Sequence, residues 1–204
     1  MVKFDLHPQN PNKRDVKTIV DILKDGGIGV IPTDSVYALT CLKSNKDGIE
    51  RIIKITGKAE KKAKLSLLCK DLKEVADHTL PYDNHIFKTM KRYLPGPYTF
   101  ILNANSSVTK FFKNNKKEIG IRIPDNEVVQ GILEILDEPL ISTSLNLEDS
   151  DFDFLTGIEG IESMYKGTVD FVVDSGPLEL GETTILDCTS GEIILVREGK
   201  GVID

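Results

Sequence analysis

Apolar positions along this chain recur with two periods, and these periods predict helices and strands in turn. Spacings of three and four residues predict amphipathic helices that begin after Asp15 and after Ser44, and further helices over 83–94 and 126–136. Short apolar runs predict strands at 28–31, 65–69, 98–103, 119–124, 139–142, 169–174, 184–188 and 192–197. The acidic segment 148–165 is predicted to hold a loop and one helix. Helices and strands alternate early and strands cluster late, which predicts an α/β or α+β fold with a mixed parallel and antiparallel sheet.

We find no internal repeat, no low-complexity linker and no shift in composition that would mark a domain boundary. A chain of 204 residues is compatible with one large domain. The expectation is therefore a single domain over 1–204.

The strand predicted at 28–31 runs directly into Pro32, which has no backbone donor and should stop the ladder there. Thr33, Asp34, Ser35 and Tyr37 follow within five residues. In open α/β sheets, ligands bind beyond the carboxyl ends of strands, so these side chains are candidates for ligand contact. The alternative is a polar loop around a buried, hydrogen-bonded tyrosine.

Arg122 lies inside an otherwise apolar strand, between Ile121 and Ile123. A buried guanidinium is costly unless it meets an anion, which could be a ligand or a carboxylate such as Asp34 or Asp187. Other predicted strands also end in polar groups: Ser142, Thr143, Ser144, Asn146, Thr183, Thr184, Asp187 and Arg197. Together these residues predict a hydroxyl-rich site with two arginines, suited to a small zwitterion and a phosphate chain.

The net charge of -6 is unevenly distributed. Residues 1–147 hold 23 Lys+Arg against 18 Asp+Glu, whereas residues 148–204 hold 3 against 14. Basic side chains crowd the span from Arg51 to Lys70, which suits phosphate from a nucleotide or an RNA backbone, although lysine-rich faces are also commonly just solvated. No apolar run reaches membrane-spanning length, and the chain starts without a secretory signal. The three widely spaced cysteines are expected to be buried free thiols, and we expect a cytoplasmic protein without a membrane partner.

Several catalytic motifs are absent from the sequence: there is no G-x-x-x-x-G-K-[ST], G-x-G-x-x-G, G-x-S-x-G or H-E-x-x-H. The histidines His7, His78 and His85 lack metal-ligand spacing, so we expect surface or capping roles and no resident metal. If a nucleotide binds, residues other than a Walker loop must hold its phosphates.

Six short motifs occur in the order found in the YrdC/YciO family, which the chain therefore resembles from about Val16 to Gly201. They are Pro32-Thr-Asp-Ser-Val-Tyr-Ala-Leu39, Pro95-Gly-Pro-Tyr-Thr99, Gly120-Ile-Arg-Ile-Pro124, Ser142-Thr-Ser-Leu-Asn146, Thr183-Thr-Ile-Leu-Asp187 and Arg197-Glu-Gly199. The resemblance implies a twisted α/β sheet with a concave, positively charged surface. It also implies a threonylcarbamoyl-adenylate synthase, which joins L-threonine, bicarbonate and ATP, releases pyrophosphate, and serves the machinery that makes N6-threonylcarbamoyladenosine in tRNA.

Carried over by position, the resemblance implies roles for the following residues. Ser35, Arg122, Ser142 and Thr183 would bind threonine, Lys58, Ser144, Asn146 and Arg197 would bind ATP, and Thr33 and Tyr37 would line the pocket. ATP would be bound with Mg²⁺, and no side-chain nucleophile is required. Members of this fold also bind double-stranded RNA, for which Lys61, Lys62 and Lys64 are the candidates.

The chain departs from the synthases where these usually carry Lys-x-Arg followed by Pro-Leu-Ser. Here Thr56 replaces the lysine, Lys58 the arginine and Lys64 the proline, and a lysine does not reproduce a forked guanidinium. Tyr37-Ala-Leu39 and Ser144-Leu-Asn146 also add bulk, and several features look more like the YciO branch. Three interpretations stay open: a synthase, a YciO-like module that binds nucleotide and RNA with little synthesis, and a structural protein whose motif residues satisfy one another.

Overall fold

A ten-stranded mixed sheet runs through the computed structural model, which describes residues 1–57, 64–112, 117–145, 158–178 and 181–204. The strand order is β1-β8-β2-β3-β7-β4-β6-β5-β9-β10. The strands are β1 (Val2–Asp5), β2 (Gly29–Ile31), β3 (Ala38–Leu42), β4 (Ser66–Leu68), β5 (Tyr98–Asn103), β6 (Glu118–Arg122), β7 (Leu140–Ser144), β8 (Phe171–Asp174), β9 (Thr184–Asp187) and β10 (Ile194–Arg197). Parallel pairs (β1–β8, β2–β8, β4–β6, β5–β9) and antiparallel pairs are mixed in one sheet, which confirms the predicted fold class of a mixed α/β domain.

Helices cover both faces of the sheet. They are α1 (Lys13–Lys24), α2 (Lys46–Ile55), α3 (Leu72–His78), α4 (Asn84–Tyr93), α5 (Ser106–Thr109), α6 (Glu127–Ile135) and α8 (Ile158–Tyr165). None of these helices in the described part of the chain is both long enough and apolar enough to cross a bilayer.

The predicted helices are present, but two predicted N-caps are wrong. Asn12, not Asp15, caps α1 by accepting a hydrogen bond from Arg14 N, and Asp15 instead lies in the first turn. Asn45, not Ser44, caps α2 by accepting from Gly48 N. The Ser44 hydroxyl donates to Glu138 Oε1 at 2.6 Å, because the end of β3 brings it next to the loop before β7. The preference for Asn, Asp and Ser at N-caps does not distinguish between neighbouring candidates.

Two apolar cores lie on opposite faces of the sheet. On one face, α1 and α6 pack over alternate residues of the central strands: Ile31, Leu42, Leu68, Leu140 and Phe171. On the other face, α2, α3, α4, α5 and α8 contribute to a larger core with Val30, Leu67, Phe100 and Ile121. Side chains alternate between the two faces along each strand, so the position of a residue in a strand determines which core it joins.

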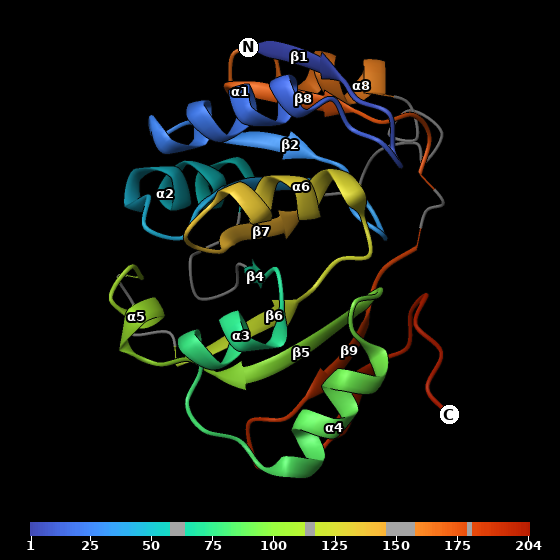
Figure 1. The fold of residues 1–204 in the computed structure, drawn as a ribbon. Coiled ribbons are helices and arrows are strands. Elements are labelled where there is room, and N and C mark those ends of the chain that lie inside the picture. Colours follow the sequence, from blue (N-terminus) through green and yellow to red (C-terminus); the bar gives the residue numbers. More distant parts are fainter. Residues whose placement is uncertain (58–63, 113–116, 146–157, 179–180) are drawn as a thin grey trace.

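The order of strands brings distant parts of the chain together (Figure 1). The N-terminal strand β1 lies at one edge beside β8, and the C-terminal residues lie near α4 at the other end of the molecule. There Arg92 forms an ion pair with Asp204 at 2.6 Å. The loops that follow β2 and β6 and the segment that precedes β9 can therefore meet, although they are far apart in sequence.

Candidate functional site

In the loop between β2 and β3, the Thr33 hydroxyl bonds to the backbone of the loop itself. Thr33 Oγ1 donates to Val36 O at 2.6 Å and accepts from Ser35 N at 3.1 Å. The hydroxyl oxygens of Thr33 and Ser35 lie 3.0 Å apart, and both side chains are buried. β2 does end immediately before Pro32, as predicted from the missing donor. The loop therefore presents a fixed pair of hydroxyls rather than a mobile polar turn.

Arg122, the last residue of β6, points its guanidinium into this loop. Its Nη2 donates to Ser35 Oγ at 3.0 Å and to the carboxylate of Asp34, and lies 3.4 Å from Thr33 Oγ1. Of the partners left open by the sequence, the structure selects Asp34. The Arg122 and Asp34 side chains are each only 6% exposed, so the ion pair is almost completely withdrawn from water.

The guanidinium of Arg122 is not fully satisfied by these contacts. Its Nε is buried and has no hydrogen-bond partner in the described part of the chain. A buried N–H without an acceptor typically costs about 1–3 kcal/mol. Burial lowers the pKa of Arg122, and the charge of Asp34 opposes that shift. An arginine stays protonated under such conditions, so this position keeps a positive charge.

A second polar group surrounds Thr183, just before β9. Arg197, the last residue of β10, donates from Nη2 to Thr183 O at 2.9 Å and from Nε to the same oxygen at 3.2 Å. The hydroxyls of Thr183 and Thr99 lie 2.8 Å apart. Arg197 also pairs with Glu182 at 2.8 Å, and its side chain is 31% exposed. One face of this guanidinium thus remains accessible to solvent.

Both arginines point to the same face of the sheet. Arg122 follows Ile121, and Ile121 pairs with Phe100, which lies in the larger core. After a register shift in β10 between Leu195 and Arg197, Arg197 pairs with Ile185, which neighbours Leu186 of that same core. Because neighbours along a strand point to opposite faces, Arg122 and Arg197 both lie opposite the larger core.

Small and hydroxyl side chains occupy that face between the arginines. Thr40, Ser142, Ser66 and Gly120 are consecutive partners across β3, β7, β4 and β6. A Cβ on Gly120 would lie 2.5 Å from Ser66 Oγ and 3.0 Å from Thr99 Cγ2. A glycine therefore leaves space for these two side chains at this point of the sheet. We call this surface the polar face, defined by Thr40, Ser66, Thr99, Gly120, Ser142 and Thr183 together with Arg122 and Arg197.

Asp34 joins the two arginine groups. Its Oδ2 accepts from Asp125 N at 3.0 Å, and its backbone carbonyl accepts from Lys200 Nζ at 3.1 Å. Lys200 also donates from its backbone N to Glu182 O at 2.9 Å, next to Thr183. Three segments of the chain therefore converge at the loop after β2.

The other predicted site residues are placed as follows. Ser144 ends β7 and is exposed, on the same side of that strand as Ser142. Tyr37 lies in the larger core, and its hydroxyl donates to Gly176 O at 3.1 Å, so its ring is directed away from the polar face. Lys64 is exposed just before β4. Lys58, Lys61, Lys62 and Asn146 lie outside the described residues.

Sequence reasoning missed several residues of the site. Ser66 and Thr99 are single hydroxyls in apolar strands, and only the folded sheet shows that both side chains approach Gly120. Lys200 belongs to no motif of the sequence, and its contact with the Asp34 carbonyl was not predicted. Ser175 lies apart from the polar face: its buried Oγ has no partner among the described residues, and its N lies 3.5 Å from Tyr37 Oη.

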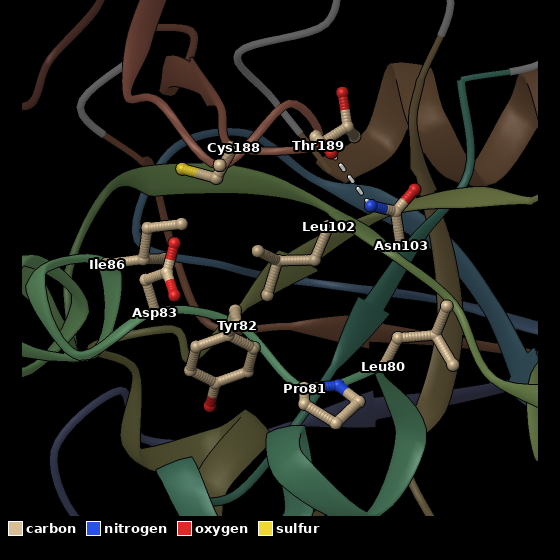
Figure 2. Close-up of a pocket in the computed structure, with 10 residues that line it drawn as sticks. Leu80, Pro81, Tyr82, Asp83, Ile86, Leu102, Asn103, Cys188 and Thr189 are labelled. Carbon is tan, nitrogen blue, oxygen red and sulfur yellow. Dashed lines mark hydrogen bonds between the residues drawn. The ribbon is translucent and has the colours of Figure 1, made fainter.

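A separate hollow of about 100 Å³ lies at the start of α4 (Figure 2). Asp83, Ile86, Leu102 and Cys188 line it, and Asn103 Nδ2 donates to Thr189 O at 2.9 Å at its rim. Burial raises the pKa of Cys188 to about 11, so its thiol is protonated and unreactive at neutral pH. None of the predicted site residues lines this hollow.

The chemistry that the polar face can offer is anion binding and orientation. It has two guanidiniums and several hydroxyls, but Asp34 and Glu182 are each engaged by an arginine. No group of three His, Cys, Asp or Glu side chains in the described ranges could hold a metal ion.

Comparisons with known proteins point to one family. The Sua5/YciO/YrdC family model, whose description is "Telomere recombination", matches residues 21–199. YciO of Escherichia coli (strain K12), an uncharacterized protein, is 38% identical over 97% of this chain and 95% of its own length. The crystal structure of E. coli YciO matches with a TM-score of 0.89 and covers 99% of this chain and 98% of that one.

More distant structures share the fold. The crystal structure of P. abyssi Sua5 complexed with L-threonine matches with a TM-score of 0.87 at 18% identity, over 98% of this chain and 58% of that one. Full-length HypF in a phosphate- and nucleotide-bound form matches with a TM-score of 0.72 at 14% identity, over 90% of this chain and 29% of that one.

Proposed function

The chain belongs to the Sua5/YciO/YrdC family, and from that membership we propose that it is a nucleotidyltransferase that makes threonylcarbamoyl-AMP from L-threonine, bicarbonate and ATP. The observation that carries the proposal is Arg122, buried among the hydroxyls of Thr33 and Ser35 with its Nε lacking an acceptor. The likeness to a Sua5 structure complexed with L-threonine and to a nucleotide-bound HypF supports the same class of ligands.

The proposed reaction has two steps. The amine of threonine adds to bicarbonate, and loss of water leaves an N-carboxylate. An oxygen of this carbamate then attacks the α-phosphorus of ATP, and the bond to the bridging oxygen breaks, so that pyrophosphate leaves with the electron pair. Neither step needs a side-chain nucleophile, and the main contributions of a protein are positioning and stabilisation of negative charge.

Each part of the polar face suits a part of this reaction. Arg122 and the Ser35 hydroxyl would hold the carboxylate of threonine, and Thr183 and Ser142 would orient its amine and hydroxyl. Arg197 is half-exposed on the same face and would contact the phosphate chain. Mg²⁺ would enter with ATP, held by phosphate oxygens and water, and would neutralise charge on the departing pyrophosphate.

The direct test is pyrophosphate release by purified protein supplied with L-threonine, bicarbonate and Mg-ATP. We expect release that requires threonine and disappears in Arg122→Ala. Arg14→Ala, which removes an exposed arginine from α1, is the matched control and should retain full activity. Threonine-dependent release that is absent at high protein concentration would rule out this function, and release that Arg122→Ala leaves intact would rule out the role given to Arg122.

The second candidate function is a nucleotide- and RNA-binding protein with little synthesis. It is favoured by the 38% identity to YciO and by the sequence at 56–58, where Thr56 and Lys58 stand in place of the lysine and arginine of synthases. In this case, calorimetry should detect Mg-ATP binding while pyrophosphate release stays at background. Restoring Thr56→Lys and Lys58→Arg together should then raise release, since a guanidinium binds phosphate in a fork.

Duplex RNA binding is a part of this second candidate. The basic side chains of Lys61, Lys62 and Lys64 would make a salt-sensitive contact with the phosphate backbone. Reversing Lys61 and Lys64 to Glu should weaken binding and flatten its dependence on salt. Unchanged binding by that double variant would place any RNA contact elsewhere.

A further inference from the structure

Thr99 of β5 has a strand neighbour on each side at the polar face. β5 and β6 run antiparallel, and their register, extended by one residue, places Thr99 beside Arg122. Gly96 N donates to Ile123 O at 3.0 Å, so the two strands stay adjacent past this point. On its other side, Thr99 pairs with Ile185 of β9.

This pairing completes a row that joins the two arginines. Ile185 is also the partner of Arg197 in β10, so the row runs Arg122, Thr99, Ile185, Arg197 across four neighbouring strands. β6, β5 and β9 lie side by side in Figure 1. Because neighbouring strands are about 4.8 Å apart, the Cα atoms at the two ends of the row are about 14 Å apart. Cross-strand neighbours project to the same face, so a ligand that reaches both guanidiniums passes over Thr99.

We propose that Thr99 binds the carbamoyl group of the ligand, the part that comes from bicarbonate, by donating its hydroxyl proton to a carbamate oxygen. This role rests on the proposed function, and it gives a place in the site to the one substrate that has no residue assigned to it. The order of the row mirrors the order of the ligand. The threonine carboxylate lies at Arg122 and the phosphate chain at Arg197, and the carbamoyl group is the link between them.

The Thr99 hydroxyl has a proton to donate. Its Oγ1 lies 2.8 Å from Thr183 Oγ1 and has no other hydrogen-bond partner among the described residues. Arg197 Nη2, which can only donate, lies 3.5 Å from Thr183 Oγ1, so Thr183 accepts on that side. Thr183 then donates to Thr99, and the Thr99 proton has no acceptor within the part of the chain that the structure describes.

A ligand oxygen would satisfy this donor. A buried hydroxyl without an acceptor is costly, and the bond to a charged oxygen is stronger than one to a neutral oxygen. A hydroxyl that accepts a hydrogen bond also donates more strongly, so the chain from Arg197 through Thr183 to Thr99 suits an anion. Thr99 is 8% exposed, compared with 5% for Arg122 and 2% for Ser142, so its accessibility matches that of the other residues assigned to the ligand.

The test compares Thr99→Ala with Thr99→Ser, two variants that both lack the methyl group and differ only in the hydroxyl. Pyrophosphate release would be measured over a range of bicarbonate concentrations, with L-threonine and Mg-ATP at saturation. We expect Thr99→Ala to lose about tenfold or more in kcat/KM for bicarbonate, because it loses a hydrogen bond to a charged group. Thr99→Ser should stay within about twofold of the wild-type chain, because it keeps that bond.

Binding measurements distinguish this role from a structural one. Calorimetry would give the affinities for L-threonine without bicarbonate and for Mg-ATP, and both should be unchanged in Thr99→Ala. Thr79→Ala is the matched control: it removes a buried hydroxyl that donates to Val75 O at 3.0 Å at the end of α3, and it should change none of these constants. Circular dichroism would check that each variant is folded. Thr99→Val, which has nearly the volume of threonine, gives the same comparison with the wild-type chain if Thr99→Ala does not fold.

Three results would count against the role of Thr99. The same bicarbonate dependence in Thr99→Ala and Thr99→Ser would overturn it and leave the proposed function standing. Parallel losses for threonine, Mg-ATP and bicarbonate would mean that Thr99 only holds Thr183 and Arg197 in place, and would also overturn it. A wild-type chain that releases no pyrophosphate at any bicarbonate concentration would refute both the function and this role.

Discussion

Arg122 and Asp34 form an ion pair in which each side chain is only 6% exposed, and this pair joins the end of β6 to the loop after β2. Desolvating two charges is expensive, and the Coulomb attraction and the surrounding hydrogen bonds offset that cost. Two of these surrounding hydrogen bonds are the one that Asp34 accepts from Asp125 N and the one that Arg122 donates to Ser35. The geometry of the candidate site thus depends on keeping both charges.

Removal of one charge from this pair should be strongly destabilising. We expect Asp34→Asn to lower the free energy of unfolding by about 3–5 kcal/mol, because it leaves the buried guanidinium uncompensated. Urea unfolding followed by circular dichroism would measure the change. The same substitution at Asp5, whose side chain is 78% exposed in its pair with Lys3, should have almost no effect. A small effect at Asp34 would mean that water reaches the pair.

Position 120 should tolerate only glycine. A methyl group there would lie 2.5 Å from Ser66 Oγ, so Gly120→Ala should destabilise the protein by about 1–3 kcal/mol and weaken ligand binding at the polar face. Thermal unfolding and calorimetry would measure the two effects.

Gly131 in α6 is the matched control, because a Cβ there would make only ordinary contacts of 3.8 and 3.9 Å. Gly131→Ala should stabilise the helix by about 0.5–1 kcal/mol. Similar effects of the two substitutions would contradict the proposed crowding at Gly120.

Thr184 should be the main attachment point of the C-terminal segment. Thr184→Val keeps the shape but removes both hydrogen bonds, to Gly199 N and to Gly201 O, and should cost about 1–3 kcal/mol. Hydrogen exchange should speed up at residues 198–202 and not in α1. Thr18→Val, which removes a hydroxyl bond to Arg14 O on the exposed side of α1, should leave that exchange unchanged.

His78 should make stability depend on pH just below neutrality. Burial lowers its pKa below the usual histidine value of about 6.5, and the charge of Lys43 adds to the shift. The unfolded chain therefore binds a proton more readily than the folded one, so the free energy of unfolding should fall as the pH drops below about 6.5. Denaturant titrations from pH 7.5 to pH 5.5 would show this slope.

His78→Gln should flatten the slope, and His85→Gln, at an exposed position in α4, should not. A slope that survives in His78→Gln would assign it to another group.

Much of the fold could be read from local patterns. The missing backbone donor of Pro32 predicts where β2 ends. Apolar periodicity predicts the strand that contains Arg122 and the helix α4. The structure has all three features. β1, β3, α3 and α5 were not predicted. β3 starts directly after the polar loop and all five of its residues are buried, so its sequence shows no alternation that would have marked it as a strand.

The candidate site was only partly visible in the sequence. Thr33, Ser35, Arg122 and Thr183 could be named in advance because hydroxyls and an arginine at strand ends are unusual in a chain built only for packing. Tyr37 was grouped with them by its position in the motif, but alternation directs its ring into the opposite core. Thr99 stands in one of the quoted motifs, but neither it nor Ser66 gave a local sign of facing the site, because that depends on strand partners 54 to 86 residues away.

The amino-acid sequence by itself determined which residues could carry charge and hydroxyls into a site and where the chain must turn, because propensity, proline and apolar periodicity act over a few residues. The tertiary structure decided that Arg122 meets Asp34, that two arginines share one face, and that Lys200 reaches the Asp34 carbonyl. Those relationships depend on the order and register of ten strands, and long-range backbone pairing is a property of the folded sheet rather than of any local segment.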